Sequence, residues 1–439
     1  MTAQLSTPPC ELQDKIVLPG DRRYGLLRST YTTAARPAAV LLPETPAEVA
    51  TAVRFARESG LPLAVRSGGH GLSGRSSNDD GVVIDLSALD RVEVLDRRTR
   101  IVRVETGARW AQVAQALAPH GLAISSGDHG NVGVGGLASA GGIGWLVRRY
   151  GLTIDHIRAA EVVLADGTLV RADADHEPDL LWAVRGAGAG VGIVVALEIE
   201  ALELGDVGFA QIAVQVDPEG RALRQWADHM AAAPRELSTA VTLLPYGSSL
   251  VASITAVVAD DSEPLIRRAI EPLLTIGDCL LQQQAQLVPY PALVPTAHLH
   301  ANTGQQPSIT TNGLLTTMTA ETAAALTAAA TGPQQTLIQL RSLGGAVNDM
   351  PAEGTAFAHR HHSTLVVASV FPPQHGAELD AAWKPLAGRI EGAYLGFESR
   401  PDDQTFARIY PGETGHRVTR LWKHYDPEGT FQALWTPVP

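Results

Sequence analysis

Three clusters of glycine in the first half of the chain have the composition of loops that hold a phosphate group. They are the runs 66–71 and 186–192, and the run 127–144 with eight glycines in eighteen residues. Glycine adopts positive φ and lets bare backbone N–H groups approach a ligand, which is what a pyrophosphate requires. One such cluster could be only a tight turn. Three of them, each expected at the end of a strand, favour a nucleotide-binding site.

A Rossmann fold is the competing interpretation of the second cluster. The run 133–138 fits the fingerprint GxGxxA, and Asp155 lies about twenty residues further on. That fingerprint should follow directly on an apolar strand, whereas the polar and glycine-rich run 126–131 precedes it here. The Rossmann interpretation therefore remains the weaker alternative.

The elements that must carry these loops can be predicted from the pattern of residues 39 to 201. Thr45, Pro46 and Glu48 form a capping box with proline at the first helical position, so a helix should begin there. Asp166-Gly167 between two apolar runs predicts a hairpin turn. Strands are expected at 63–65, 82–86, 101–105 and 193–199, and a second helix at 108–118.

From about residue 205 the pattern changes to longer strands that alternate with alanine-rich helices. This favours an α+β domain with an antiparallel sheet and helices on one face. Segment 284–316 is predicted to be a long surface loop or lid, and segment 413–431 an amphipathic helix followed by a turn. The strands are expected at 209–216, 240–244, 250–258, 337–340 and 364–371, and the helices at 219–232, 262–275, 319–330 and 377–391.

Composition narrows the class of protein. The chain has 439 residues with 34 basic and 46 acidic side chains, a net charge of −12, and 45% hydrophobic residues. This excludes a disordered chain and argues against nucleic-acid or membrane-surface partners, which need clustered Lys and Arg. The three lysines have no neighbouring glycine loop, and the two cysteines form no CxxC pair. Without a signal peptide or a long apolar run, we expect a soluble cytoplasmic protein that acts on a small molecule.

The order of the motifs resembles that of the FAD-linked oxidases of the vanillyl-alcohol-oxidase, or PCMH-type, superfamily. It is most similar to the berberine-bridge-enzyme-like branch, which includes bacterial 6-hydroxynicotine oxidases. The motifs extend over nearly the whole chain in order. They are RSGGHG at 66–71, VGVGG at 132–136, GGIG at 141–144, YGL at 150–152 with Asp155, DLLWAVRG at 179–186, GIV at 192–194 and KHYDPEGTF at 423–431.

The resemblance implies a two-part FAD-binding domain of PCMH type and a central α+β substrate domain with an antiparallel sheet. The expected boundaries are 1–204 for the first part of the FAD domain, 205–397 for the substrate domain and 398–439 for the return to the FAD domain. The FAD-binding residues expected are Arg66, Ser67, Gly68, Gly69, His70, Gly71, Ser73, Gly127, His129, Val132, Gly133, Gly135, Gly136, Gly141, Gly142, Gly144, Gly192, Ile193 and Val194.

The resemblance also implies how FAD is attached and how O2 reaches it. The histidine of the first glycine loop, here His70, is joined to the flavin 8α-methyl in this family. Many relatives add a second bond from a cysteine at the position of His129, so a single covalent bond is expected here. Val132 occupies the position that controls access of O2 in relatives, and a core valine without that role is the equal alternative.

The base that takes the substrate proton is less clear. Relatives use a tyrosine in a YxNY-like strand, where this chain has Tyr394, Gly396 and Phe397. Tyr394 keeps its family position and is ranked first, with Arg341 as the cation that would lower its pKa. Tyr246, His361 or a bound water could take the proton instead, and Gln339 and His359 are further candidates. A core role is the alternative for both tyrosines. The asparagine pair that ends relatives is replaced by Leu434 and Thr436.

Two histidine-rich runs, at 359–362 and at 298–300, could suggest a metal site. Neither has cysteine or carboxylate partners at the spacing of a known zinc set, so no metal is expected. His359 and Arg360 match a family motif that is expected to order a loop.

These observations predict an FAD-dependent oxidase that takes hydride from an alcohol, hemiacetal or amine carbon of a small-to-medium metabolite. O2 would be the electron acceptor and H2O2 the product, in a monomer or homodimer. The first alternative is a flavoprotein that catalyses a redox-neutral cyclisation with FAD in a structural role, and the second is a non-catalytic flavin-binding module. Release of peroxide with turnover would distinguish the oxidase from both alternatives.

Overall fold

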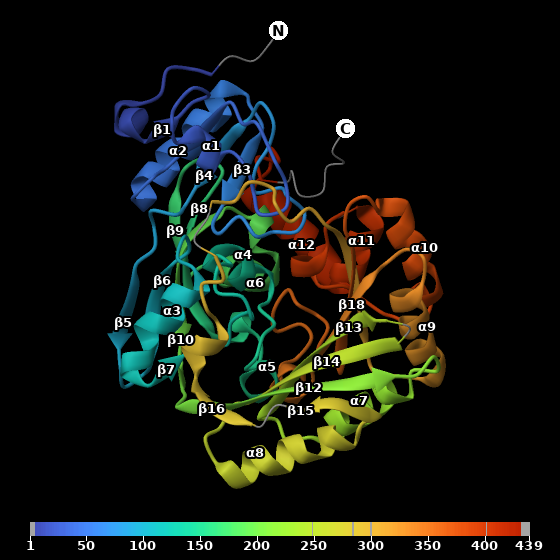
Figure 1. Cartoon of the computed structure of the whole chain (residues 1–439). Helices are drawn as coiled ribbons and strands as arrows, with labels where there is room; N and C mark the ends of the chain where they lie inside the picture. Colours follow the sequence, from blue (N-terminus) through green and yellow to red (C-terminus); the bar gives the residue numbers. More distant parts are fainter. Residues whose placement is uncertain (1–4, 248, 283–284, 299–300, 401, 432–439) are drawn as a thin grey trace.

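The computed structural model describes residues 5–247, 249–282, 285–298, 301–400 and 402–431. His300, Leu434 and Thr436 lie outside these residues. The molecule contains a small sheet near the N-terminus, a five-stranded sheet beside it, and an eight-stranded sheet that forms the opposite half (Figure 1). This confirms the expected mixed fold with antiparallel sheets. No helix among the described residues is long and apolar enough to cross a membrane.

The N-terminal sheet carries the first glycine loop. Its strands follow the order β1 (Ile16–Val17), β2 (Ala39–Leu41), β4 (Val82–Asp85) and β3 (Leu63–Arg66). The pairs β2–β4 and β4–β3 are parallel, so the chain needs a crossover helix, which is α2 (Pro46–Ser59). Thr45 caps α2 by accepting a hydrogen bond from the Glu48 N–H at 3.2 Å, which confirms the predicted helix start.

The five-stranded sheet is antiparallel throughout. The predicted hairpin turn is confirmed, because Gly167 has φ +85° between β8 and β9. The strand order is β5 (Val92–Asp96), β6 (Ile101–Glu105), β10 (Ile193–Glu200), β8 (Ile157–Val163) and β9 (Leu169–Ala172). Helices α3 (Trp110–Leu117), α4 (Val134–Ala140), α5 (Val147–Tyr150) and α6 (Pro178–Ala187) belong to the same half, with a two-stranded pair of β7 (Leu122–Ala123) and β11 (Leu202–Glu203).

The eight-stranded sheet separates two hydrophobic cores. Helices α7 (Arg221–Ala232), α8 (Glu263–Ile270), α9 (Ala320–Thr331) and α10 (Gly376–Ala387) pack on one face, as predicted. On the other face Leu314, Leu365 and Val367 join the core of the glycine-loop half. The strand order is β15 (Asp278–Gln282), β12 (Asp206–Val216), β14 (Ser249–Val258), β13 (Leu237–Tyr246), β18 (Leu337–Ser342), β19 (Thr364–Val370) and β17 (Ile309–Leu315), and β16 (Gln286–Pro289) also pairs with β12.

The prediction that 284–316 is one long loop is wrong at both ends. β16 extends the edge of the sheet, and β17 is a strand with Thr311 and Asn312 buried. The side chain of Asn312 explains how a polar residue is accommodated there. Its amide group donates to the Tyr394 carbonyl at 3.0 Å and accepts from the Tyr394 N–H at 2.7 Å, so it pairs with backbone as a neighbouring strand would.

The C-terminal helices return to the glycine-loop half. Helix α12 (Gly412–Tyr425) follows α11 (Asp403–Ile409), and the helix predicted in 413–431 is confirmed. The Trp422 indole N–H donates to the Ala187 carbonyl at 2.9 Å, and the Tyr410 hydroxyl donates to the Gly186 carbonyl at 3.0 Å. Both ends of the chain therefore contribute to this half, while the exact domain boundaries at 204 and 397 stay predictions.

Candidate active site

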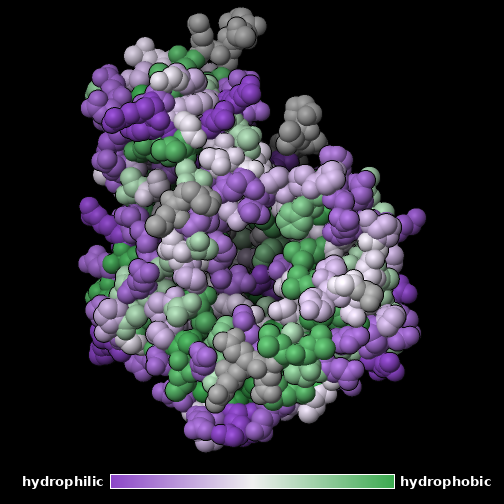
Figure 2. Space-filling view, viewed as in Figure 1, coloured by the Kyte–Doolittle hydropathy of each residue, from purple (hydrophilic) through white to green (hydrophobic). Residues whose placement is uncertain are grey.

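A cavity of about 500 Å³ lies where the glycine loops meet the eight-stranded sheet. Figure 2 shows a recess in this region of the surface. Its lining comes from all three glycine clusters, from β18 and from the segment 394–398 that follows α10. Of the expected FAD-binding residues, the lining includes Ser67, Gly68, Gly69, His70, Gly71, Ser73, Gly127, His129, Val132, Gly133, Gly135, Gly136, Gly192, Ile193 and Val194.

Two of the glycine loops touch each other directly. A Cβ on Gly68 would lie 2.3 Å from the amide nitrogen of Gly133, and one on Gly133 would lie 2.1 Å from that of Gly68. Only glycine allows this approach at both positions. A Cβ on Gly71 or Gly136 would meet nothing within 4 Å, although both residues line the cavity. The loops therefore form a cradle that leaves bare backbone facing open space.

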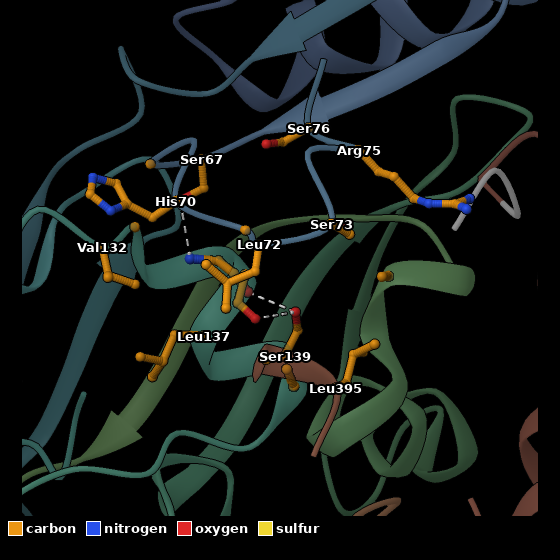
Figure 3. Close-up of a pocket in the computed structure, with 18 of the residues that line it drawn as sticks. Ser67, His70, Leu72, Ser73, Arg75, Ser76, Val132, Leu137, Ser139 and Leu395 are labelled. Carbon is orange, nitrogen blue, oxygen red and sulfur yellow. Dashed lines mark hydrogen bonds between the residues drawn. The ribbon is translucent and has the colours of Figure 1, made fainter. Parts of the chain in front are cut away.

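Hydroxyl groups fix the first two loops relative to each other. The Ser67 hydroxyl donates to the Thr106 carbonyl at 2.5 Å and accepts from the Gly135 N–H at 3.3 Å. The Ser139 hydroxyl donates to the Gly135 carbonyl at 2.7 Å (Figure 3). The bond between Ser67 and Gly135 joins the first glycine loop to the second, and the Ser139 bond lies within the second. The shape of the cradle is therefore fixed by hydrogen bonds within the chain.

His70 lies at one side of this cradle, and Val132 lines the same cavity (Figure 3). Its ring is stacked on Tyr31, with centroids 4.4 Å apart and planes inclined by 16°. The rings of His129 and His298 are 5.2 Å and 5.7 Å away. Nε2 of His70 is buried and has no hydrogen-bond partner among the described residues.

The electrostatic setting keeps His70 neutral. Burial lowers the pKa of His70 to about 3, and the neighbouring charges of His129, Arg109 and His298 add to the effect. Burial also lowers the pKa of His129. A neutral imidazole with an unused lone pair can act as a nucleophile or ligand, whereas a protonated one cannot. The arrangement therefore suits a bond from His70 to an electrophile in the cavity.

Four residues expected to bind the cofactor support the cradle from behind instead. The Arg66 guanidinium forms a buried ion pair with Asp85 at 2.7 Å and donates to two backbone carbonyls, so its charge is turned away from the cavity. Gly141 and Gly142 pack against Tyr394 and Thr153, and Gly144 packs against the backbone at 126–127. These three glycines are needed for close packing rather than for lining the cavity.

Tyr394 lines the cavity, but its surroundings do not make it a base. Its hydroxyl oxygen accepts a hydrogen bond from the Gly142 N–H at 3.1 Å. Burial raises the pKa of Tyr394 to about 12, because the phenolate would lose its hydration. Arg341, the cation expected to activate it, forms an ion pair with Asp128 and lies over the Phe397 ring at 5.0 Å. Tyr394 therefore stays protonated near neutral pH.

The other catalytic candidates lie away from the cavity lining. Tyr246 ends β13 and is 74% exposed, and His361 is 67% exposed beside Glu391. Gln339, on β18, does not line the cavity either. Both side chains face solvent rather than the enclosed space, so the structure gives no support to Tyr246 or His361 as catalytic residues. The Nε2–H of His359 donates to the backbone carbonyls of Arg408 and Ile409, which is a structural role.

Arg360 orders its loop, in agreement with the expected role of the motif. Its guanidinium makes two hydrogen bonds to the Asp155 carboxylate, at 2.8 Å and 2.9 Å, in a fully buried pair. Asp155 is thus engaged structurally and does not bind a ribose. A Rossmann fingerprint should also join a strand directly to a helix, whereas helix α4 follows a loop. The structure therefore disfavours the Rossmann interpretation.

Two residues of the site have no clear signal in the sequence. Asp128 lines the cavity and binds Arg341, which comes from β18 in the other half of the molecule. Tyr31 stacks on His70 from an irregular segment before β2. For Asp128 the one indication is its position between Gly127 and His129, which are both expected to bind FAD. Nothing in the sequence around Tyr31 indicates its contact.

Comparisons with known proteins place an FAD-binding domain in the first half of the chain. Residues 37–173 match the family described as FAD binding domain. The (R)-6-hydroxynicotine oxidase of Paenarthrobacter nicotinovorans is 34% identical over 206 residues, which are 46% of this chain and 44% of that protein. The FAD-linked oxidoreductase YgaK of Bacillus subtilis is 25% identical over 96% of both chains.

The fold extends this similarity to the whole chain. The structure of 6-hydroxy-D-nicotine oxidase from Arthrobacter nicotinovorans superposes with a TM-score of 0.83 and 24% identity, covering 97% of this chain and 98% of that one. The matched FAD-binding region includes the first two glycine loops, with His70 and Val132. Residues 37–173 therefore match an FAD-binding domain, and the whole chain has the fold of 6-hydroxy-D-nicotine oxidase.

Proposed function

We propose that the cavity binds FAD and that the protein is an oxidase for an alcohol, hemiacetal or amine carbon of a small-to-medium metabolite. The observation that carries the proposal is the buried Nε2 of His70, which has no hydrogen-bond partner in the described part of the chain and lies beside a cradle of bare glycine backbone. The backbone at Gly71 and Gly136 is open toward the cavity, as a pyrophosphate-containing cofactor requires. The apolar walls, including Leu137 and Ile143, suit a flat heteroaromatic ring.

His70 is the residue proposed to hold FAD covalently. Its low pKa keeps the imidazole neutral at physiological pH, so that a ring nitrogen is free to form the bond. His129 lines the same cavity with its ring 5.2 Å from that of His70, but it is not a thiol. A single attachment through His70 is therefore proposed.

Bound FAD would supply a two-electron acceptor that takes hydride from a substrate carbon and passes the electrons to O2. The substrate hydroxyl or amine must also lose a proton. Asp128 is the proposed acceptor of this proton, because it is a carboxylate in the cavity lining, whereas Tyr394 is held protonated. Arg341 would fix the Asp128 carboxylate, and Tyr394 would orient the substrate as a hydrogen-bond donor.

The test uses the purified protein as it is expressed, with a panel of secondary alcohols, aldoses and cyclic amines. Mixing in the absence of O2 should bleach the visible flavin absorption with at least one member of the panel. Admission of O2 should then restore the absorption and yield one H2O2 per flavin. Restoration without peroxide, or no reduction by any member, would contradict an oxidase.

The redox-neutral alternative has one observation in its favour. The tyrosine that keeps its family position is buried with its pKa raised to about 12, and Phe397 has no ionisable group. Such a cavity could hold a substrate in the conformation that cyclises, without oxidising it. A substrate converted without flavin bleaching and without O2 consumption would support this second function.

A further inference from the structure

We propose that His361, His362 and Glu391 form a binding site for a divalent transition-metal ion, Zn²⁺ above all, outside the FAD cavity. Sequence alone argued against a metal at the histidine-rich run, because no carboxylate lies at a zinc-site spacing. The fold supplies that carboxylate from 29 residues away. Among the described residues this is the group of three whose ligand atoms all lie within 4.8 Å of one another.

Two adjacent strands position the three side chains. His361 and His362 lie just before β19, and β19 pairs with β17. Glu391 is fixed beside β17 by two backbone hydrogen bonds with Leu314, at 2.7 Å and 2.9 Å. The backbone that carries all three ligands is therefore held by the same sheet edge, so that a metal would not have to order a loose segment.

The three ligand atoms lie within 4.8 Å of one another, and one pair already has the spacing expected around one ion. Nε2 of His362 is 3.3 Å from Oε2 of Glu391, and Nε2 of His361 is 3.9 Å from the same oxygen. Zinc bonds of about 2.0–2.1 Å in a tetrahedron place neighbouring ligand atoms about 3.3 Å apart. One distance already has this value, and the other needs a small rotation of an exposed side chain.

Exposure leaves room for the remaining ligands. The His362 side chain is 1% exposed, whereas the Glu391 side chain is 69% exposed and faces solvent together with His361. Water can complete a tetrahedron with two imidazoles and one carboxylate. This donor set suits Zn²⁺ better than Ca²⁺ or Mg²⁺, which prefer oxygen ligands alone.

The test is calorimetric titration of the chelator-stripped, tag-free holoprotein with Zn²⁺. Wild type should bind one ion at this site, and His361→Gln and Glu391→Gln should each weaken that binding by at least about tenfold. His416→Gln is the matched control, because His416 and Glu413 form an exposed pair at 3.4 Å without a second histidine. This control should bind as wild type does.

Thermal melting provides a second readout that does not depend on activity. An ion that binds the folded state alone raises the melting temperature, so Zn²⁺ should raise that of wild type and of His416→Gln more than that of Glu391→Gln. Because His361 and Glu391 are exposed, neither substitution should disturb the core. Equal binding by wild type and Glu391→Gln, or no binding by wild type, would overturn the site.

Discussion

At the scale of single residues, the site depends on what surrounds two rings, those of His70 and Tyr394. Burial lowers the pKa of His70 to about 3 and raises the pKa of Tyr394 to about 12, so burial keeps each ring in its neutral form. A neutral imidazole can form a covalent bond, whereas a neutral phenol cannot take a proton. The same physical cause therefore favours one predicted role and disfavours the other.

Tyr31 should assist attachment of FAD by holding the His70 ring. The stack at 4.4 Å is worth about 0.5–1.5 kcal/mol, which corresponds to a roughly two- to tenfold slower attachment when it is lost. Tyr31→Leu should therefore contain a smaller covalent fraction of FAD soon after reconstitution, and Tyr31→Phe should match wild type. The covalent fraction is measured from the flavin that remains in acid-precipitated protein. Equal fractions in Tyr31→Leu and wild type would rule out this role.

Val132 should control the reaction with O2. It lines the same cavity as His70, and the added methyl group in Val132→Ile would fill part of the space proposed for the flavin (Figure 3). We expect reoxidation of photoreduced enzyme to slow by about tenfold, equal to about 1.4 kcal/mol of barrier. Stopped-flow absorbance measures the rate without any substrate, and Val132→Ala is the control. If Val132→Ile reoxidised as fast as wild type, Val132 would be ordinary packing.

Asp128 should matter more than Tyr394 for removal of the substrate proton. With a substrate that bleaches the flavin, Asp128→Asn should slow reduction by about a hundredfold or more, as expected for a general base. Tyr394→Phe should have a smaller effect, because its phenol is already protonated below pH 10. Rapid-mixing reduction of both variants decides between them. The opposite order of effects would return the role to Tyr394.

At the scale of elements, the sequence pattern located most strands and helices, because each had one clear periodicity. One missed strand is β17, whose run of threonine, asparagine and glycine has the composition of a loop. Its polar side chains are buried because Thr311 donates to Glu398 and Asn312 pairs with the backbone of Tyr394. Both partners lie more than 80 residues away, and no local pattern contains that information.

The same limit applies to the candidate site. The loops around His70 were predictable because glycine has a local signature, whereas the pairing of Asp128 with Arg341 joins two halves of the molecule. Arg66 shows the opposite case. It belongs to the glycine motif, but its buried pair with Asp85 directs it away from the cavity. A motif therefore predicts which segment forms the site more reliably than which side chain faces it.

The buried pair of Arg360 and Asp155 should hold the loop before β19 against the glycine-loop half. Removing one partner leaves an uncompensated buried charge, so Arg360→Met should lower the free energy of unfolding by about 3–5 kcal/mol. The double variant with Asp155→Asn should lose less than the sum of the two single variants, because it leaves no such charge. Urea unfolding measures all three variants. Strict additivity would show that the two residues act independently.

At the scale of the whole molecule, buried neutral histidines predict loss of stability in acid. In the folded chain, burial lowers the pKa of five histidines besides His70, the proposed site of FAD attachment. For His359 the pKa falls to about 4. The unfolded chain binds protons below its ordinary value of about 6.5, so it takes up more protons than the folded chain does. The five are His129, His156, His229, His359 and His362.

The free energy of unfolding should therefore have its full value above pH 6.5 and decrease progressively as the pH is lowered toward 4. Each extra proton bound by the unfolded chain lowers the free energy of unfolding by about 1.4 kcal/mol per pH unit. The melting temperature should decrease from pH 7 to pH 5, and His156→Asn should show a shallower decrease than wild type. A melting temperature that is constant or rises over this range would contradict the account.

The central claim is that the cavity holds FAD bound to His70, and peptide mass analysis tests it most directly. Protein purified without added cofactor is denatured in acid, digested and separated, and the flavin-coloured peptide is sequenced by fragmentation. The account predicts one such peptide, with the FAD mass on His70 and none on His129, and no covalent flavin in His70→Ala. A colourless peptide pool with free FAD in the supernatant, or FAD on another residue, would contradict it.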